Sequence, residues 1–267
     1  MIKALRREIG LYRDLHRENS QSTLQHLWWA KTRNRRELVQ VSIDGEKVFV
    51  RTGTPDLDVA RWTLGGEFHS LARAFPRDQR GLILDAGGYI GTAAIALSKL
   101  YPLANVVTIE PSSDNFAVLS QNIAPHPRIH AHHAALVPAN SPRVRTLRNR
   151  GSGEWGFNIV ENETDTSANV IEEVTTVTLD ELLQTYDAKN VLILKMDIEG
   201  AEYPLLKEPL WLNWTNILVI ELHERLVAGC ENAFATANRN RFVYADGEKY
   251  VSVGANFFDP HLPTLAT

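Results

Sequence analysis

Five short apolar runs, separated by stretches of helical periodicity, constrain the fold of this chain more than any other feature. They begin at residues 82, 105, 129, 191 and 216 and read LILDAGG, NVVTIE, IHAHHAALV, VLILKMD and NILVIEL. Continuous apolar runs are typical of parallel strands that are covered on both faces. Strands that alternate with helices predict an α/β fold with a doubly wound, mostly parallel sheet.

The flanking segments predict the domain organisation. The chain has 267 residues, which suits one large domain with an appendage. We expect a basic helical extension over residues 1–37, because residues 1–36 hold nine Lys or Arg and three Asp or Glu. Residues 38–267 form the main domain, which starts with a hairpin around Asp44-Gly45. Within it, the polar residues 138–173 predict an inserted loop and strand, a candidate substrate lid.

Composition excludes several classes of protein. The net charge of −4 gives no reason to expect a nucleic acid partner. The basic extension is expected to pack as a helix on the main domain or on a second subunit, which would make the protein a homo-oligomer. Contact of that basic face with an anionic lipid or polymer is the alternative. The single cysteine, Cys230, excludes an intrachain disulfide and a thiolate zinc site. No apolar run reaches about 18 residues, so we expect no transmembrane segment and a cytoplasmic location.

The turn from Asp85 to Gly91 predicts a cofactor site. It leaves a strand and enters a helix, where nucleotide-like ligands bind on doubly wound sheets. Its glycines are spaced G-G-x-x-G rather than G-x-G-x-x-G, and a carboxylate at Asp85 would repel a pyrophosphate. Glu110 ends the next strand and can accept hydrogen bonds from ribose hydroxyls. These features favour S-adenosylmethionine, which is cationic; a purely structural tight turn is the alternative.

A second group of acidic residues follows the fourth and fifth strands. The segment KMDIEGAE carries Asp197, Glu199 and Glu202, and the fifth strand ends in Glu221 with His223 two residues later. These residues are expected at the rim where ligands bind. Histidine is the commonest general base near neutral pH. Structural alternatives are helix capping by Glu199 or Glu202 and a purely structural histidine.

At these motifs the chain resembles the FkbM-type family of S-adenosylmethionine-dependent methyltransferases. The resemblance covers roughly residues 40–225 and rests on LDAGGYIGTAAIAL, VTIEPSSDNFAVLSQNI, VTTVTLDELL, LILKMDIEGAEYPLL and ILVIELHE. It departs from the family at Gly88-Tyr89, where alanine-asparagine is usual. The resemblance implies a class I (Rossmann-like) methyltransferase fold with a seven-stranded, mostly parallel sheet and an antiparallel last strand. It also implies cofactor contacts from Asp85, Gly87, Gly88, Tyr89, Gly91, Glu110, Pro111, Ala134, Ala135 and Asp197.

The resemblance further implies methyl transfer to a hydroxyl, foremost on a sugar of a glycan or a glycosylated natural product. We expect Asp197 or His223 to accept the hydroxyl proton, with Glu199 and Glu221 orienting the acceptor and Trp155 stacking on it. Our interpretation includes no metal, and the alternative is a cation held by Asp197, Glu199 and Glu221. The motifs are also compatible with a polyketide-type acceptor, with an RNA 2′-hydroxyl, and with a homologue that binds the cofactor without transferring methyl.

Overall fold

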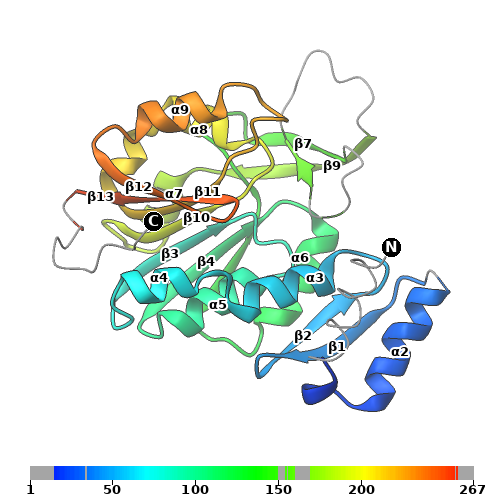
Figure 1. The fold of residues 1–267 in the computed structure, drawn as a ribbon. Helices are drawn as coiled ribbons and strands as arrows, with labels where there is room; N and C mark the ends of the chain where they lie inside the picture. Colours follow the sequence, from blue (N-terminus) through cyan, green and yellow to red (C-terminus); the bar gives the residue numbers. More distant parts are fainter. Residues whose placement is uncertain are drawn as a thin grey trace.

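A seven-stranded sheet forms the centre of the protein (Figure 1), which is described from a computed structural model. The structure describes residues 15–33, 35–149, 154, 156–159, 169–255 and 257. The strand order is β12-β13-β11-β10-β3-β4-β5. In chain order the strands are β3 (Gly81–Ala86), β4 (Ala104–Glu110), β5 (Ile129–His133), β10 (Val191–Met196), β11 (Thr215–Glu221), β12 (Arg241–Asp246) and β13 (Lys249–Gly254).

The direction of these strands confirms the predicted doubly wound sheet. The five strands from β11 to β5 pair in parallel, and all five predicted apolar runs lie in them. The last strand, β13, inserts between β11 and β12 and is antiparallel to both. This is the sheet that a class I methyltransferase has, with its antiparallel final strand.

Helices cover both faces of the sheet, which explains why the strands read as continuous apolar runs. One face carries α3 (Asp56–Trp62), the π-helix η1 (Thr63–Glu67), α4 (His69–Ala74), α5 (Thr92–Leu100) and α6 (Ser113–Ile123). The other carries α7 (Leu179–Thr185), α8 (Glu202–Lys207), the 3₁₀ helix η2 (Pro209–Trp214) and α9 (Cys230–Ala237). In Figure 1, α4 and α5 lie below the sheet and α8 and α9 above it. Successive residues of β3, Ile83 and Leu84, are fully buried in opposite cores.

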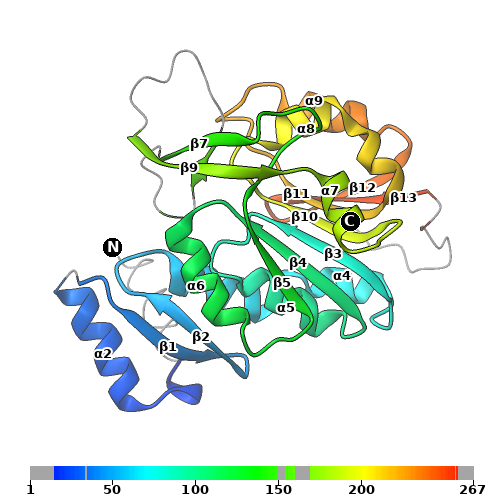
Figure 2. The ribbon, with the colours of Figure 1, turned by 180° about the vertical axis from the view of Figure 1, so that it is seen from behind.

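The inserted region differs from the sequence prediction. The strand expected over residues 129–137 breaks at Ala134, and β6 (Ala135–Leu136) joins a separate sheet in the order β6-β9-β7-β8. The predicted inserted strand corresponds to β8, which spans only Phe157–Asn158. The flanking segments, predicted as loops, contain two further strands, β7 (Val144–Asn149) and β9 (Asn169–Val177), so that prediction is wrong. In β7 the buried apolar residue is Leu147, so alternation was too weak to reveal the strand. Figure 2 shows β7 and β9 projecting beyond the main sheet.

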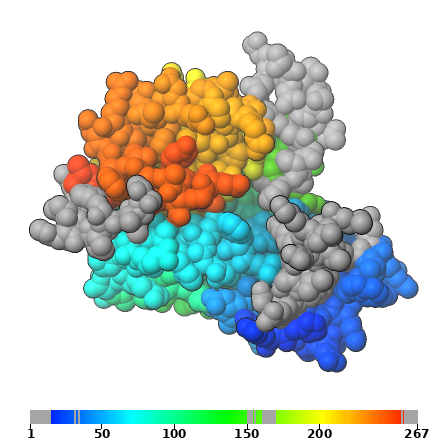
Figure 3. Space-filling model, in the orientation of Figure 1, coloured from blue at the N-terminus to red at the C-terminus, as the bar shows by residue number. Residues whose placement is uncertain are grey.

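The N-terminal part packs against helices α3 and α6 through a hairpin. The strands β1 (Leu38–Ile43) and β2 (Glu46–Arg51) pair in antiparallel register around Asp44 and Gly45, as predicted. The helix α2 (Gln21–Thr32) packs on this hairpin through Leu24 and Leu27, and Figure 3 shows this blue segment at the lower edge of the molecule. The basic helix predicted before it lies in residues 1–14, outside the described residues. The division at residue 37 and the lid role of residues 138–173 stay predictions.

Within the described part of the chain, none of the helices has the length and apolar character that crossing a membrane requires.

Candidate functional site

The carboxyl ends of the four central strands meet at one edge of the sheet. In the strand register, the last residue of β10 lies beside the last residue of β3 and the penultimate residue of β11. The end of β3 in turn lies beside the end of β4. Gly87, Glu110, Asp197 and Glu221 therefore lie along the same edge, where the sequence placed them.

The glycines after β3 are required by close backbone approach. Gly87 has a φ of +80°, and a Cβ added to it would lie 1.8 Å from the carbonyl oxygen of Asp197. A Cβ on Gly88 would lie 2.1 Å from the hydroxyl oxygen of Thr108. Gly91, with a φ of +84°, precedes the first residue of α5. The backbone of the turn thus lies directly against the loop that carries Asp197. Glycine permits this close approach and the positive φ angles because it has no Cβ.

Asp85, just before this turn, is paired with a lysine of the neighbouring strand β10. Its side chain is fully buried, 3.1 Å from the Nζ of Lys195, and accepts a 2.9 Å hydrogen bond from the Thr108 hydroxyl. Lys195 also donates to the carbonyl oxygen of Gly87 at 2.8 Å. Burial opposes the charge on Lys195, but Asp85 and Asp197 outweigh it and raise its pKa. Lys195 thus neutralises the charge of Asp85, and contact of Asp85 with the cofactor stays a prediction.

Glu110 has the surroundings expected of a group that binds ribose hydroxyls. It accepts hydrogen bonds from the backbone N–H of Tyr89 (2.9 Å) and Ser112 (3.0 Å) and from the Asn115 amide (3.2 Å). These donors use three of the roughly four acceptor positions of a carboxylate. Burial raises the pKa of Glu110 to about 7 although these donors oppose the shift. A remaining acceptor position beside the glycine turn fits S-adenosylmethionine.

A polar network from the hairpin supports Glu110, and the sequence did not reveal it. Arg51, the last residue of β2, donates to both carboxylate oxygens of Asp56 at 2.8 and 2.9 Å, and to the Asn115 side chain at 2.8 Å. Asn115 donates in turn to Glu110, and the Tyr89 hydroxyl donates to Asp56 at 2.5 Å. Tyr89 has a φ of +49°. Tyr89 therefore contacts this network through its hydroxyl and Glu110 through its backbone.

Three further residues predicted to contact the cofactor follow the ends of β4 and β5, namely Pro111, Ala134 and Ala135. Ala134, at the bend, and Ala135 have buried side chains, and the Ala134 N–H donates to the Glu110 carbonyl oxygen at 3.2 Å. The Pro111 carbonyl oxygen lies 3.0 Å from the Nε2 of His133. These positions offer backbone rather than side-chain contacts, and their cofactor role stays a prediction. Trp155, the predicted stacking residue, lies outside the described residues.

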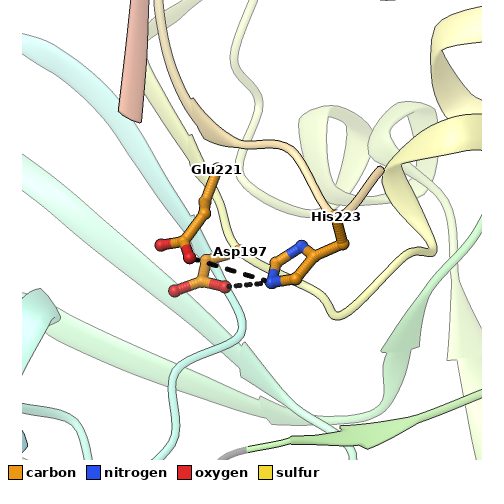
Figure 4. Close-up of side chains that lie close together, drawn as sticks. All are labelled: Asp197, Glu221 and His223. Atoms are coloured by element: carbon orange, nitrogen blue, oxygen red, sulfur yellow. Dashed lines mark ion pairs between the residues drawn. The ribbon is translucent and has the colours of Figure 1, made fainter. Parts of the chain in front are cut away.

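The acidic residues and His223 converge into one group, the His223 cluster (His223, Asp197, Glu199, Glu202 and Glu221). Nε2 of His223 lies 3.7 Å from Oδ1 of Asp197, 3.6 Å from Oε2 of Glu199 and 3.9 Å from Oε1 of Glu221. Figure 4 shows three of these side chains pointing toward one another from the ends of β10 and β11. Ligand atoms of Asp197, Glu221 and His223 all lie within 4.8 Å of one another.

Glu202 fixes the orientation of the imidazole. It is fully buried and accepts hydrogen bonds from the backbone N–H of Ile198 (2.9 Å) and Gly200 (2.7 Å). Its Oε1 also lies 2.9 Å from Nδ1 of His223. Glu202 therefore binds the loop before α8 and His223 rather than capping the helix, which has no side-chain cap. Nε2 is left facing Asp197, Glu199 and Glu221.

Burial and mutual charge shift the pKa values of this cluster. Burial opposes the charge on His223, but the carboxylates of Glu202, Glu199 and Asp197 outweigh it and raise its pKa to about 9. Burial, together with the neighbouring carboxylates, raises the pKa of Glu199 to about 7, although His223 opposes the shift. Burial also raises the pKa of Glu221, with Asp197 adding to the shift and Lys249 opposing it. The carboxyl groups of Glu199 and Glu221 therefore bind a proton more readily than exposed carboxylates do.

Two further charged residues reach the cluster without a sequence signal. Lys249, on β13, lies opposite Glu221 in the strand register, and its Nζ is 3.6 Å from Oε2 of Glu221. Lys249 also forms an ion pair with Glu67 of η1. The antiparallel pairing of β13 with β11 produces this contact, so no local motif could have predicted it.

Comparisons with known proteins agree with this arrangement. A family model described as Methyltransferase FkbM domain matches residues 85–242, more than half of the chain. A protein named Methyltransferase 1 from Beauveria bassiana (strain ARSEF 2860) is 26% identical over 150 residues, which is 50% of this chain and 59% of that protein. The match thus spans less than two thirds of that relative.

Solved structures with similar folds have low sequence identity. P. horikoshii TYW2 in complex with MeSAdo is 16% identical, with 81% of this chain and 69% of that chain covered and a TM-score of 0.40. Aeropyrum pernix fibrillarin with natively bound S-adenosyl-L-methionine is 9% identical, with 81% of each chain covered and a TM-score of 0.40. Because the family model matches more than half of the chain, including both motifs at the carboxyl edge of the sheet, the chain belongs to the FkbM family of methyltransferases, whose cofactor is S-adenosylmethionine.

Proposed function

We propose that this chain transfers a methyl group to a hydroxyl oxygen, foremost on a sugar of a glycan or a glycosylated natural product. The observation that carries the proposal is the His223 cluster at the carboxyl ends of β10 and β11, next to the glycine turn. A hydroxyl is a weak nucleophile until its proton is removed. The cluster supplies several proton acceptors at the edge where the cofactor binds.

The chemistry of the cluster also supports a polyhydroxylated acceptor. The side chains of Asp197, Glu199 and Glu221 are between 21% and 31% exposed, so they remain partly accessible. Ionised carboxylates only accept hydrogen bonds, and a sugar offers several hydroxyl donors close together. The same charges disfavour a phosphate-bearing acceptor, which argues against RNA as the substrate.

Residues of the cluster divide the work of the reaction. When bound, S-adenosylmethionine supplies a methyl group activated by its cationic sulfur. Asp197 or His223 accepts the acceptor's hydroxyl proton, while Glu199 and Glu221 hold neighbouring hydroxyls. The raised pKa of His223 favours Asp197, because an imidazolium has no lone pair for a proton. Glu110 and the backbone from Gly87 to Tyr89 hold the cofactor, so positioning supplies much of the rate enhancement.

Donor-labelled methyl transfer to deoxysugar glycans, nucleotide sugars, polyketides and RNA tests the proposal. We expect label in a sugar ether, and Asp197→Asn should lower kcat by about 100-fold or more, the usual contribution of a general base. Calorimetry of each variant separates loss of turnover from loss of cofactor binding. Glu208→Gln, an exposed carboxylate at the end of α8, is the matched control and should keep full activity.

Three results would overturn the proposal. Full turnover in both Asp197→Asn and His223→Ala, with normal cofactor binding, would remove the cluster from the chemistry. Label found on nitrogen would exclude transfer to oxygen. Label in RNA alone, with a steep dependence on salt, would assign a nucleic acid acceptor instead.

A further inference from the structure

We propose that Asp197, Glu221 and His223 bind a divalent first-row cation that contacts the acceptor hydroxyl. The inference rests on the proposed function, because it assigns a further component to the same site, and it departs from the metal-free site expected from the sequence. The three ligand atoms come from the ends of two neighbouring parallel strands, β10 and β11. Their convergence is a property of the fold rather than of one short motif.

The distances within the cluster suit ligands around a shared centre better than direct contacts. Nε2 of His223 lies 3.7 and 3.9 Å from the nearest oxygens of Asp197 and Glu221, too far for hydrogen bonds. Ligands about 2.1 Å from one cation are roughly 3.0–3.6 Å apart at angles of about 90–120°. The ligand atoms, at most 4.8 Å apart, therefore need to approach one another by only about 1.2 Å to form a coordination shell.

The orientation of His223 is the second observation. Histidine ligands almost always donate their other ring N–H to a carboxylate or carbonyl, which fixes the tautomer and aims the free nitrogen at the metal. Here Nδ1 lies 2.9 Å from the fully buried Glu202, which two backbone N–H groups hold in place. Nε2 is thereby directed at the carboxylates of Asp197 and Glu221, and a cation bound there would displace the proton that Nε2 otherwise carries.

The charge around the site also favours a cation. The ion pairs join five carboxylates, those of Glu67, Asp197, Glu199, Glu202 and Glu221, to His223 and Lys249. The buried Lys195 is committed to Asp85 and Gly87 and compensates a different charge. A divalent ion would offset part of the remaining negative charge. One nitrogen and two carboxylate ligands suit Mn²⁺, Fe²⁺ or Zn²⁺ better than Mg²⁺, which prefers oxygen alone.

The cation gives the cluster a defined division of roles. Bound to the acceptor oxygen, it makes the hydroxyl more acidic. The hydroxyl proton then passes to Glu199, whose Oε2 lies 3.6 Å from Nε2 of His223. As the O–H bond breaks, the oxygen forms a bond to the methyl carbon, and the electron pair of the carbon–sulfur bond stays on sulfur. With the cation bound, Asp197 is a metal ligand, so Glu199 replaces it as the proton acceptor.

Mn²⁺ binding to the chelator-treated full chain, followed by electron paramagnetic resonance and calorimetry, tests the inference. We expect one saturable site per chain. Glu221→Gln and Asp197→Asn should each weaken it at least about 10-fold, and Glu202→Gln about 10- to 100-fold through loss of the group that orients His223. The exposed Glu208→Gln is the matched control and should bind as the wild type does. Thermal denaturation of each variant distinguishes a lost site from a lost fold.

The outcomes separate this inference from the proposed function. No saturable Mn²⁺ site in the wild type, or unchanged affinity in Glu221→Gln, overturns the cation site. If methyl transfer to a hydroxyl then proceeds fully in excess chelator, the proposed function stands without it. A saturable site that Glu221→Gln abolishes, in a chain that methylates no hydroxyl acceptor, supports the cation site and refutes the proposed function.

Discussion

Replacing Gly87 with alanine should separate the cofactor turn from the loop that carries Asp197. The added Cβ would lie 1.8 Å from the Asp197 carbonyl oxygen, whereas real Cβ contacts essentially never fall under 3.0 Å. The two segments must therefore move apart by roughly 1.2 Å. Neither side can yield alone, because the Asp197 N–H donates to the Ala86 carbonyl oxygen at 3.1 Å and Lys195 holds the Gly87 carbonyl oxygen.

Gly45→Ala provides a matched control for the cost of the backbone conformation alone. Gly45 has a φ of +77°, close to the +80° of Gly87, but a Cβ there would meet nothing within 4 Å. A left-handed conformation costs a non-glycine residue about 1–2 kcal/mol, and both variants share this cost. Forced overpacking adds about 1–3 kcal/mol, which applies to Gly87→Ala alone.

Urea denaturation and labelled methyl transfer measure the two consequences. We expect Gly87→Ala to lose about 2 kcal/mol more free energy of unfolding than Gly45→Ala. Because misplacing reacting groups by about 1 Å can lower rates about 100-fold, its turnover should fall by that order, while Gly45→Ala stays active. Equal stability and equal turnover in the two variants would refute the claimed contact between the turn and the Asp197 loop.

Three further variants test the surroundings of Glu110. Burial raises the pKa of Glu110 to about 7, so its carboxylate form is lost as the pH falls through that value. Cofactor affinity measured by calorimetry should decline in the same pH range. Glu110→Gln should bind the cofactor weakly at every pH. An affinity of the wild type that ignores pH between about 6 and 8 would contradict this. Arg51→Met leaves the fully buried Asp56 unpaired and should cost about 3–5 kcal/mol in urea denaturation, partly restored by adding Asp56→Asn. Tyr89→Phe removes a hydrogen bond to Asp56 but keeps the backbone N–H on Glu110; it should cost about 1–2 kcal/mol and change cofactor affinity less than threefold.

Features written in short stretches of sequence were predictable. The Asp44-Gly45 hairpin is present as predicted, and Thr178 and Glu181 form a capping box, because neighbouring residues determine turns and caps. The same holds for the central strands, whose burial on both faces leaves a continuous apolar run. It also holds for Asp197 and Glu221, since parallel strands end at a shared edge.

Contacts between distant segments could not be predicted in this way. Arg51 and Asn115 are 64 positions apart, and Lys249 reaches Glu221 because an antiparallel strand lies between β11 and β12. For Asp85 the sequence predicted the position but not the partner. Its position in the turn was apparent, but the lysine that neutralises it comes from a strand 110 residues later. Strand β7 escaped prediction because its faces differ little in burial.

The segment that matches the family model and the segment that supports the cofactor site begin at different residues of this chain. The recognisable FkbM segment begins at residue 85, yet the guanidinium that orders Asn115 and, through it, Glu110 is contributed by Arg51. A chimaera could take residues 85–242 from a relative. It would then contain the relative's glycine turn and acidic motifs without the relative's own residue at the position of Arg51. Such an exchange should carry β1, β2 and the start of α3 along with it. The smallest transplantable methyltransferase unit is thus larger than the segment that evolution has kept recognisable.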